Sequence, residues 1–505
     1  MTHHHILQNG SDIRGIAIAT DEYAVNLTPQ ATKEIVRGLI HWLIQNPDLE
    51  RAYQESRLTI GIGRDSRLSG PDLVDAFTEE AVRLGVQLID FGMATTPALF
   101  MSTQYSQFAC HAGVMITASH LPYYFNGIKI FSANGGAEHE DIEFILAHND
   151  DLPTSSLGSV IKADLITPYS QDLVTKIRQA CNGEEQPLSG LNIIVDAGNG
   201  AGGFFADKVL TALGADTTGS QFLDPDGTFP NHVPNPDNKE AMESIRQAVL
   251  TQRADLGIIF DTDVDRAALV TKSGEILNRN NLIAVLSQIV LSEHPGTSIV
   301  TNSPTSEHLK VFIEELGGQQ IRYISGYRNV INRAIRANKD GVDCQLAIET
   351  SGHAAFKENY FLDDGTYVAA KILMLLPKLQ SQGKSLDDLI RQLKQPIETQ
   401  EIRFKLEVEE YRKLGEQAIE ALSKMDIEGF TLNPENEEGV RFDLTNSYGE
   451  GWCLLRMSLH EPLLVLQIEN DHAGYIPSVL QTISRFLDQY PDVNQSKLKE
   501  YPSVS

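Results

Sequence analysis

A serine close to basic groups is the first feature of this chain with chemical meaning. Ser119 ends the apolar run GVMITA and opens the turn sequence SHLP, in which His120 follows it. Lys129 comes shortly afterwards, past an Asn-Gly turn. A hydroxyl at the end of a buried strand, with an imidazole and an ammonium nearby, is typical of a serine that carries a transferred group. On this stretch alone, an ordinary turn serine is the alternative.

Three aspartates on one short loop are the second feature. Asp261, Asp263 and Asp265 alternate directly after the apolar run LGIIF. Adjacent carboxylates repel one another unless a cation neutralises them, and their hard oxygens suit Mg²⁺. An EF-hand is excluded, because Arg266 stands where its loop needs glycine and Lys272 where it needs glutamate. The loop therefore predicts a Mg²⁺ site, with a solvated acidic turn as the alternative.

A third loop combines a carboxylate, a hydroxyl and an imidazole. Glu349, Ser351 and His353 lie in the stretch AIETSGH, after a strand-like run. These groups together suit a polyol such as a sugar. Such tripeptides are also common in turns, so this loop is a weaker signal than the first two.

Composition and charge narrow the class of protein. With 505 residues and 41% apolar residues, we expect a globular protein of three or four domains. A net charge of −27 argues against nucleic acid or an anionic membrane as partner, because both need a basic face. An anionic small substrate stays possible, since a cleft can be locally basic on an acidic protein.

The cysteines and the apolar runs indicate the cellular compartment of the protein. The four cysteines are far apart and form no CxxC pair, which is typical of reduced thiols in a cytosolic protein. The first residues lack a basic start with an apolar core, and no apolar run is long enough to span a bilayer. We therefore predict a cytoplasmic protein with neither a membrane nor a nucleic acid as partner.

Strand-like and helix-like segments alternate over about the first three quarters of the chain. This pattern predicts α/β domains with largely parallel sheets, in which functional loops lie at the carboxyl ends of strands. The last part mixes strands with two amphipathic helices, as in a smaller α+β domain. Turn-rich or polar stretches place the predicted domains at residues 1–157, 158–275, 276–398 and 399–505.

The motifs together resemble those of the α-D-phosphohexomutases, which include phosphoglucomutases and phosphomannomutases. TASHLPYYFNGIK is similar to their phosphoserine loop, TASHNP followed by YNGxK, and DTDVDR to their metal loop, DGDGDR. ETSGH resembles their sugar loop, and RMSLHEP their C-terminal phosphate loop, RPSGTEP. SDIRG, GRDSRLSG, TTPAL, DAGNGAGG, SGYRNV and DDGT also match, in family order.

This resemblance implies a fold and a set of roles. The fold is three related α/β domains plus a smaller C-terminal α+β domain around a central cleft. The implied activity is Mg²⁺-dependent phosphoryl transfer on hexose phosphates through phosphorylated Ser119. The implied catalytic residues are Ser119, His120, Lys129, Arg14, Arg64 and Arg266, with Lys129 or His120 taking the proton. The implied metal ligands are the Ser119 phosphate, Asp261, Asp263 and Asp265. The implied substrate-binding residues are Gly326, Tyr327, Arg328, Glu349, Ser351, His353, Arg456, Ser458 and His460.

Six positions depart from the family pattern. Leu121 replaces an asparagine, and Thr262 and Val264 replace glycines of the metal loop, which should stiffen it. In the phosphate loop, Leu459 replaces glycine and His460 threonine, and Val465 replaces a later arginine. A glycine-rich cradle holds phosphate through exposed backbone N–H groups, so these changes should weaken its grip.

A weakened grip on the distal phosphate favours release of a bisphosphorylated intermediate. We therefore predict synthesis of glucose 1,6-bisphosphate from glucose 1-phosphate or glucose 6-phosphate and a bisphosphorylated donor such as fructose 1,6-bisphosphate. The alternative is a conventional phosphoglucomutase or phosphomannomutase, with a sugar bisphosphate as activator.

Two remoter alternatives are a non-catalytic sugar-phosphate sensor and a phosphatase with Asp261 as nucleophile. Intact Ser119, Lys129 and the three aspartates argue against the sensor, and the other phosphatase motifs cannot be placed. The choice between glucose and mannose phosphates stays open, as does that between a monomer and a homodimer.

Overall fold

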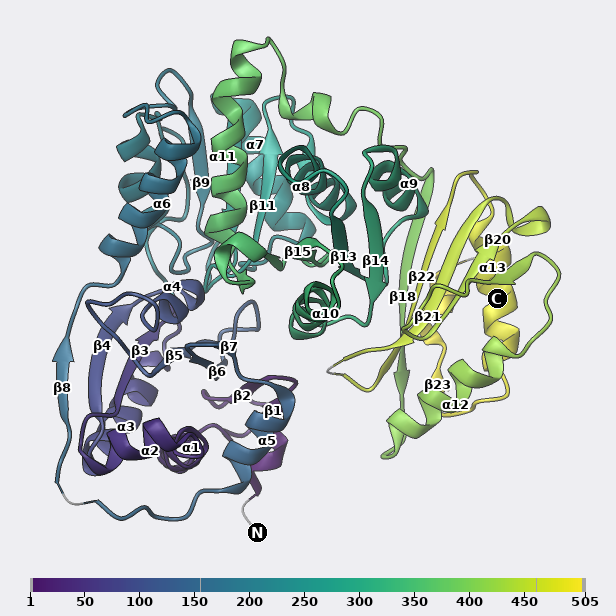
Figure 1. Cartoon of the computed structure of the whole chain (residues 1–505). Helices are drawn as coiled ribbons and strands as arrows, with labels where there is room; N and C mark the ends of the chain where they lie inside the picture. Colours follow the sequence, from purple (N-terminus) through teal and green to yellow (C-terminus); the bar gives the residue numbers. More distant parts are fainter. Residues whose placement is uncertain (1–2, 155, 460, 502–505) are drawn as a thin grey trace. The chain divides into compact units, whose positions relative to one another are not determined.

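The computed structural model describes residues 3–154, 156–459 and 461–501. The chain forms two compact units (Figure 1). The first unit comprises Met1–Leu286 and Ser351–Leu389, and the second comprises Ser287–Thr350 and Ile390–Ser505. Helix α8 (Arg279–Glu293) carries the chain from the first unit into the second.

The N-terminal part of the first unit is a mixed sheet covered by helices. Its strand order is β1-β2-β6-β5-β3-β4-β8, with β7 paired to β6. The strands are β1 (Gln8–Asn9), β2 (Asp12–Ile16), β3 (Thr59–Arg64), β4 (Gln87–Met93), β5 (Ala112–Ile116), β6 (Phe125–Ser132), β7 (Gly135–Gly136) and β8 (Ser159–Lys162). The helices are α1 (Pro29–Leu43), α2 (Pro47–Gln54), α3 (Gly70–Arg83), α4 (Thr96–Met101) and α5 (His139–Ala147).

The two faces of this sheet are packed differently. One face joins apolar side chains of α1, α3 and α5 in a large core that includes Ile60, Ile62 and Val114. On the other face, glycines let α4 come close, because a Cβ on Gly113 would lie 2.4 Å from the carbonyl oxygen of Leu99. Helix α4 begins with a Thr95 cap and a proline, both favourable at a helix start. The glycines therefore let α4 pack closely on the sheet, and the cap and the proline set where the helix begins.

The second part of this unit has a four-stranded sheet in the order β12-β11-β10-β9. Its elements are α6 (Ile166–Ala180), β9 (Ile193–Asp196), α7 (Lys239–Gln252), β10 (Leu256–Phe260), β11 (Ala267–Thr271) and β12 (Ile276–Leu277). The later segment of the unit adds the antiparallel pair β16 (Ala354–Phe356) and β17 (Leu362–Asp363), and helix α11 (Gly365–Ser381). Helix α11 packs beside α6 (Figure 1).

The prediction of largely parallel sheets is wrong for this second sheet and incomplete for the first. Strand β10 is parallel to β9 but antiparallel to β11, and β5 is antiparallel to β6. The physical reason is loop length, because a parallel return needs a crossover of a dozen or more residues. The aspartate loop and the serine loop are both shorter, so each joins two antiparallel strands.

The second unit contains a parallel sheet and an antiparallel sheet. Strand β13 lies between β14 and β15 and is parallel to both. These elements are β13 (Ser298–Asn302), α9 (Glu307–Glu315), β14 (Gln319–Tyr323), α10 (Tyr327–Lys339) and β15 (Cys344–Ile348). The antiparallel sheet has the order β19-β20-β21-β22-β18-β23. Its elements are β18 (Glu398–Leu406), α12 (Tyr411–Ser423), β19 (Phe430–Leu432), β20 (Val440–Leu444), β21 (Gly451–Met457), β22 (Leu463–Asn470), α13 (Ile476–Leu487) and β23 (Val493–Asn494).

The predicted fold class is confirmed: three α/β domains are followed by a sheet-rich C-terminal domain. The predicted boundaries and the central cleft stay predictions. Strand β8, which follows the predicted end of the first domain, pairs with β4.

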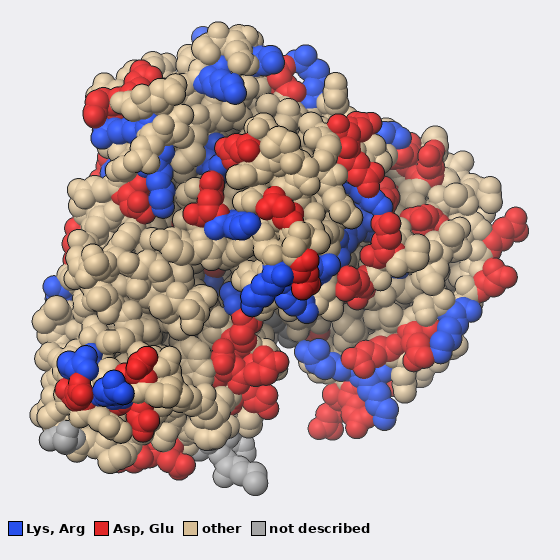
Figure 2. Space-filling view, in the orientation of Figure 1, with Lys and Arg blue, Asp and Glu red and all other residues tan. Residues whose placement is uncertain are grey.

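Among the described residues, no helix is both long and apolar enough to cross a membrane. Figure 2 shows acidic and basic side chains interspersed over the face in view.

Candidate active site

The serine loop joins β5 to β6 and holds Ser119 in an uncommon backbone conformation. Ser119 has φ +52°, in the left-handed region, which costs a non-glycine residue about 1–2 kcal/mol. Its N–H donates to Thr117 Oγ1 at 3.0 Å, and Thr117 Oγ1 donates to Asp65 Oδ2 at 2.6 Å. Ser119 itself is buried. Local hydrogen bonds therefore offset the strain and fix the direction of the hydroxyl.

The aspartate loop joins β10 to β11 and is strained as well. Val264 has φ +68°, which is a genuine outlier for a β-branched residue. The Val264 side chain is fully buried and lies close to Gly202, and its carbonyl accepts a hydrogen bond from Gly365 N at 3.1 Å. Packing of the buried side chain, together with this hydrogen bond, therefore stabilises valine at a position where the related metal loops have glycine.

Serine loop and aspartate loop meet at Ser119. Ser119 Oγ donates to Asp261 Oδ2 at 2.9 Å. Arg266 Nη2 lies 3.2 Å from the same Oγ and 2.7 Å from His120 Nδ1, and Arg266 Nε donates to Asp261 Oδ2 at 3.1 Å. Four predicted site residues are thereby in mutual contact within the first unit.

Lys129 lies among the aspartates. Its Nζ is 3.1 Å from Asp263 Oδ2 and contacts Asp265 Oδ2 more closely. Thr96, at the start of α4, donates from its hydroxyl to Asp263 Oδ2, and its N–H donates to the Asp263 carbonyl at 2.9 Å. The close approach of α4 to the sheet therefore anchors the aspartate loop.

The donor set of the aspartate loop fits a divalent cation. Asp261, Asp263 and Asp265 are buried, and each offers an oxygen within 4.8 Å of the others. Asp263 Oδ1 and Asp265 Oδ1 have no hydrogen-bond partner among the described residues. Burial, together with the charges of Asp265 and Asp263, raises the pKa of Asp261 well above its usual value. A bound cation would relieve that repulsion, so the cluster could hold a metal ion.

The two histidines near this cluster differ in charge state. Burial, followed by the charges of Arg266 and Arg14, holds the pKa of His120 well below its usual value, so its ring is neutral. Burial alone would lower the pKa of His353, but Asp363 and Asp265 raise it to about 9. His353 Nδ1 contacts Asp363 Oδ2 and lies 4.0 Å from Asp265 Oδ1. His353, predicted to contact sugar, therefore lies against the aspartate loop.

Two predicted arginines lie on two other strands of the same sheet. Arg14, on β2 beside β6, donates to Asp12 Oδ2 at 2.9 Å, and its charge acts on His120. Arg64, at the end of β3, donates to the carbonyl of Asp65 at 3.1 Å. The structure therefore connects Arg14 electrostatically to the site and gives Arg64 a contact within its own loop.

The predicted sugar-binding residues are divided between the two units. In the second unit, Glu349 follows β15, is buried and accepts from Gly326 N at 2.7 Å. Gly326 has φ +118° and precedes Tyr327 and Arg328 at the start of α10. Ser351 belongs to the first unit, on the same segment as His353.

The C-terminal phosphate loop joins β21 to β22. Arg456 lies at the end of β21, opposite Val465 of β22, and Ser458 N donates to the Leu463 carbonyl at 2.8 Å. Leu459 lies close to Gly326, since a Cβ on that glycine would be 3.0 Å from Leu459 Cδ2. His460 lies outside the described residues.

A carboxylate that the sequence did not indicate lies beside Arg456. Glu438 Oε1 is 3.8 Å from Arg456 Nη1. Glu438 Oε2 accepts from Ser325 Oγ at 2.7 Å and from Ser303 Oγ more closely.

Thr96, Asp363 and Arg67 are further residues to which the sequence patterns assign no role. Their motifs TTPAL, DDGT and GRDSR were visible in the sequence, but the partners of these side chains were not.

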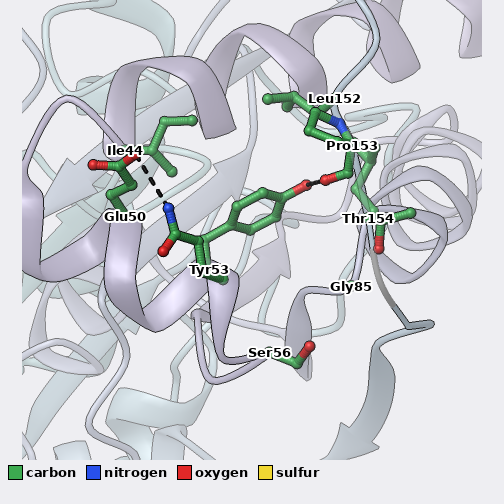
Figure 3. Close-up of a pocket in the computed structure, with 10 residues that line it drawn as sticks. Ile44, Glu50, Tyr53, Ser56, Gly85, Leu152, Pro153 and Thr154 are labelled. Atoms are coloured by element: carbon green, nitrogen blue, oxygen red, sulfur yellow. Dashed lines mark hydrogen bonds between the residues drawn. The ribbon is translucent and has the colours of Figure 1, made fainter.

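A separate pocket lies in the N-terminal part of the first unit. It has a volume of about 450 Å³ and is shown in Figure 3. Tyr53 of α2 borders it and donates to the Pro153 carbonyl at 3.2 Å. The lining residues are Ile44, Glu50, Tyr53, Gln54, Ser56, Leu84, Gly85, Leu152, Pro153 and Thr154. None of the predicted site residues is among them.

Comparison with known families places three matches along the chain. The phosphoglucomutase/phosphomannomutase alpha/beta/alpha domain I matches residues 5–150, domain II matches residues 168–274, and domain III matches residues 278–397.

Individual relatives cover most of the chain. A phosphomannomutase/phosphoglucomutase of Pseudomonas putida is 34% identical over 82% of this chain and 83% of its own. A phosphoglucomutase of Neisseria gonorrhoeae is 31% identical over 95% of this chain and 96% of its own. The crystal structure of a family protein from Burkholderia thailandensis has a TM-score of 0.78 at 26% identity, covering 98% of this chain and 99% of the other.

Proposed function

Because the chain belongs to the phosphoglucomutase/phosphomannomutase family, we propose that it interconverts hexose 1-phosphates and 6-phosphates. The observation that carries this proposal is the meeting of Ser119 Oγ with Asp261 and Arg266, which come from a separate loop. The names of the relatives favour this conventional mutase, the alternative prediction from the sequence, over bisphosphate synthesis. Glucose and mannose phosphates are the proposed substrates.

The proposed step transfers a phosphoryl group between Ser119 and a sugar hydroxyl. A new bond forms between the sugar oxygen and phosphorus while the bond from phosphorus to Ser119 Oγ breaks. The sugar hydroxyl gives its proton to His120, whose ring is neutral, and His120 passes a proton on to Ser119 Oγ, which lies 3.4 Å from its Nδ1. Arg266, within hydrogen-bond distance of Oγ, stabilises the negative charge on that oxygen.

The aspartate loop and its neighbours supply the other charges that are proposed to act on the phosphoryl group. Mg²⁺ held by Asp261, Asp263 and Asp265 would stabilise charge on the phosphoryl oxygens. Lys129 lies against Asp263 and Asp265, so we assign it to balancing their charge, and the proton to His120. Arg14 and Arg64 are proposed to bind phosphoryl oxygens as planar donors.

The other predicted residues are proposed to hold the rest of the substrate. Glu349 and Ser351 would bind sugar hydroxyls, with His353 next to them in sequence. Arg456, Ser458 and the segment Gly326, Tyr327 and Arg328 would hold the phosphate that does not react, together with His460. A cytoplasmic location and a monomeric or dimeric state stay predictions.

Product analysis tests this function. Purified protein would be incubated with glucose 1-phosphate, Mg²⁺ and a trace of glucose 1,6-bisphosphate, and in parallel with mannose 1-phosphate, and the products followed by phosphorus NMR. A mutase accumulates the 6-phosphate while the bisphosphate stays at its trace level. No isomerisation of either sugar would contradict the proposal and favour the sensor.

Bisphosphate synthesis is the second candidate, favoured by the composition of the phosphate loop. Leu459 and buried Val465 replace groups that would grip phosphate, and Glu438 places a carboxylate 3.8 Å from Arg456. With fructose 1,6-bisphosphate as donor, this candidate predicts glucose 1,6-bisphosphate in amounts comparable to the donor consumed. The variant with Leu459→Gly, His460→Thr and Val465→Arg should then release less bisphosphate relative to isomerised monophosphate. An equal ratio in the active variant and the wild type would remove the loop as the determinant.

A further inference from the structure

A buried arginine lies directly beneath the serine loop. The Arg67 side chain is fully buried, and its guanidinium is surrounded by backbone of the segment that follows β5. Nη2 donates to the carbonyls of Ser119 at 2.5 Å and Leu121 at 2.6 Å. Nη1 donates to the carbonyls of Pro122 at 2.8 Å and Phe125 at 2.9 Å. The four Nη hydrogens of one guanidinium therefore serve four carbonyls of one loop.

Asp65 provides a second connection between the Arg67 guanidinium and Ser119. Its Oδ2 lies 3.4 Å from Arg67 Nε, and its Oδ1 accepts from Arg67 N at 2.9 Å. The same Oδ2 accepts from Thr117 Oγ1, which in turn accepts from Ser119 N. Both the carbonyl and the N–H of Ser119 are thus fixed by one buried pair of charges.

The contacts of Ser119 explain why such fixing matters. Its left-handed backbone aims Oγ at Asp261 and Arg266, which belong to the aspartate loop. A relaxed loop would let Ser119 return to an ordinary conformation and swing Oγ away from those groups. A misplacement of about 1 Å in a reacting geometry can cost about a hundredfold in rate.

We infer that Arg67, braced by Asp65, is the positioning residue that holds the phosphoryl-carrying Ser119 in its reactive geometry. Arg67 acts through the carbonyls of the serine loop, without contact to substrate. Lysine cannot replace it, because a compact ammonium has three donors and lacks the planar fork that reaches four carbonyls. The inference rests on the proposed function, since it needs Ser119 to carry phosphate.

The test compares Arg67→Lys with wild type and with Arg178→Lys. Arg178 also donates to two carbonyls, those of Glu185 and Ala212, in another part of the same unit. Each protein would be loaded with glucose 1,6-bisphosphate, checked for one phosphate by intact mass, and mixed with glucose 6-phosphate in a quenched-flow instrument. Loss of the Ser119 phosphate gives the transfer rate constant, and thermal unfolding shows whether each variant is folded.

For Arg67→Lys we expect transfer slowed by about a hundredfold, with KM for the sugar phosphate within about twofold of wild type. Arg178→Lys should transfer at the wild-type rate. A folded Arg67→Lys that transfers within about threefold of wild type would overturn the inference.

Two further outcomes are distinguished from these: Arg67→Lys fails to fold, or the wild type takes up no phosphate. If Arg67→Lys fails to fold, Thr117→Val replaces it, because this variant keeps the arginine and removes the acceptor of Ser119 N. It should slow transfer about tenfold at unchanged KM, and an unchanged rate would overturn the inference. A wild type that takes up no phosphate on Ser119 would instead contradict the proposed function, and this inference with it.

Discussion

Two loops of this protein are predicted to handle phosphate, and they differ in how tightly they are built. The serine loop is buried, and its backbone and side chain contact Asp65, Arg67, Asp261 and Arg266. In the phosphate loop after β21, Leu459 is 37% exposed, and Arg456 Nε has no hydrogen-bond partner among the described residues.

This difference has a chemical reason. Transfer from a serine requires reacting atoms fixed to a fraction of an ångström, so every neighbouring group is constrained. Holding a second phosphate requires donors of the right charge but tolerates several geometries, and weaker holding speeds release. The serine loop should therefore control whether transfer occurs, and the phosphate loop should control which product leaves.

The largest expected effect is that of Ser119→Ala. It should lower transfer by about 10³-fold or more, because no other hydroxyl occupies its place between Asp261 and Arg266 among the described residues. Turnover of glucose 1-phosphate measures it. Ser132→Ala, at the end of β6 in the same hairpin, is the matched control and should stay active. Substantial turnover in Ser119→Ala would remove this serine from the mechanism.

Asp263→Asn should reduce the rate by about a hundredfold and raise the Mg²⁺ concentration needed for half-maximal activity, because one anionic ligand is lost. Titration of Mg²⁺ against rate measures both effects. In wild type, EDTA should abolish activity and added Mg²⁺ should restore it. Full activity in excess EDTA would show that the aspartate loop holds no catalytic metal.

Glu438→Gln tests the phosphate loop. It removes a negative charge 3.8 Å from Arg456 while the amide oxygen can still accept from Ser303 and Ser325. We expect KM for hexose phosphates to fall about fivefold and release of bisphosphate to fall with it, at similar kcat. Glu437→Gln, an exposed neighbour, is the matched control for loss of charge. Equal KM values in the two variants would show that Glu438 does not weaken phosphate binding.

The smallest expected effect is on the stability of the segment that contacts Arg266. Asn235 accepts from Arg266 Nη1 at 3.3 Å, and nearby His232 Nε2 lies 3.0 Å from Asp196 Oδ2. Burial alone would lower the pKa of His232, but the hydrogen bond and charge of Asp196 raise it above its usual value. The stabilisation from protonated His232 is therefore fully present below the pKa of an unfolded histidine and is lost as pH rises through the higher folded value.

His232→Gln should accordingly lower the free energy of unfolding by about 1–2 kcal/mol near pH 6, and by less near pH 9. Urea unfolding at both pH values measures the difference. An equal loss of unfolding free energy at the two pH values would mean that His232 stabilises the protein by packing alone.

Much of this protein can be read from its sequence, because local patterns carry local information. Strand β10 and helix α3 follow from apolar runs and helical periodicity, and the predicted strands and helices of the C-terminal domain are present. Ser119 and the three aspartates were found because unusual residue types stand next to strand ends. Their arrangement in two loops needed no knowledge of distant contacts.

The tertiary structure decided everything that depends on a partner far along the chain. It set Lys129 and His353 against Asp265, and it brought Arg67 beneath Ser119 and Glu438 beside Arg456. Each of these pairs joins strands, or loops that follow strands, that lie far apart in the sequence, and no local pattern encodes any of them. The charge state of a histidine and the direction of a serine hydroxyl depend on such neighbours, so only the folded chain determines them.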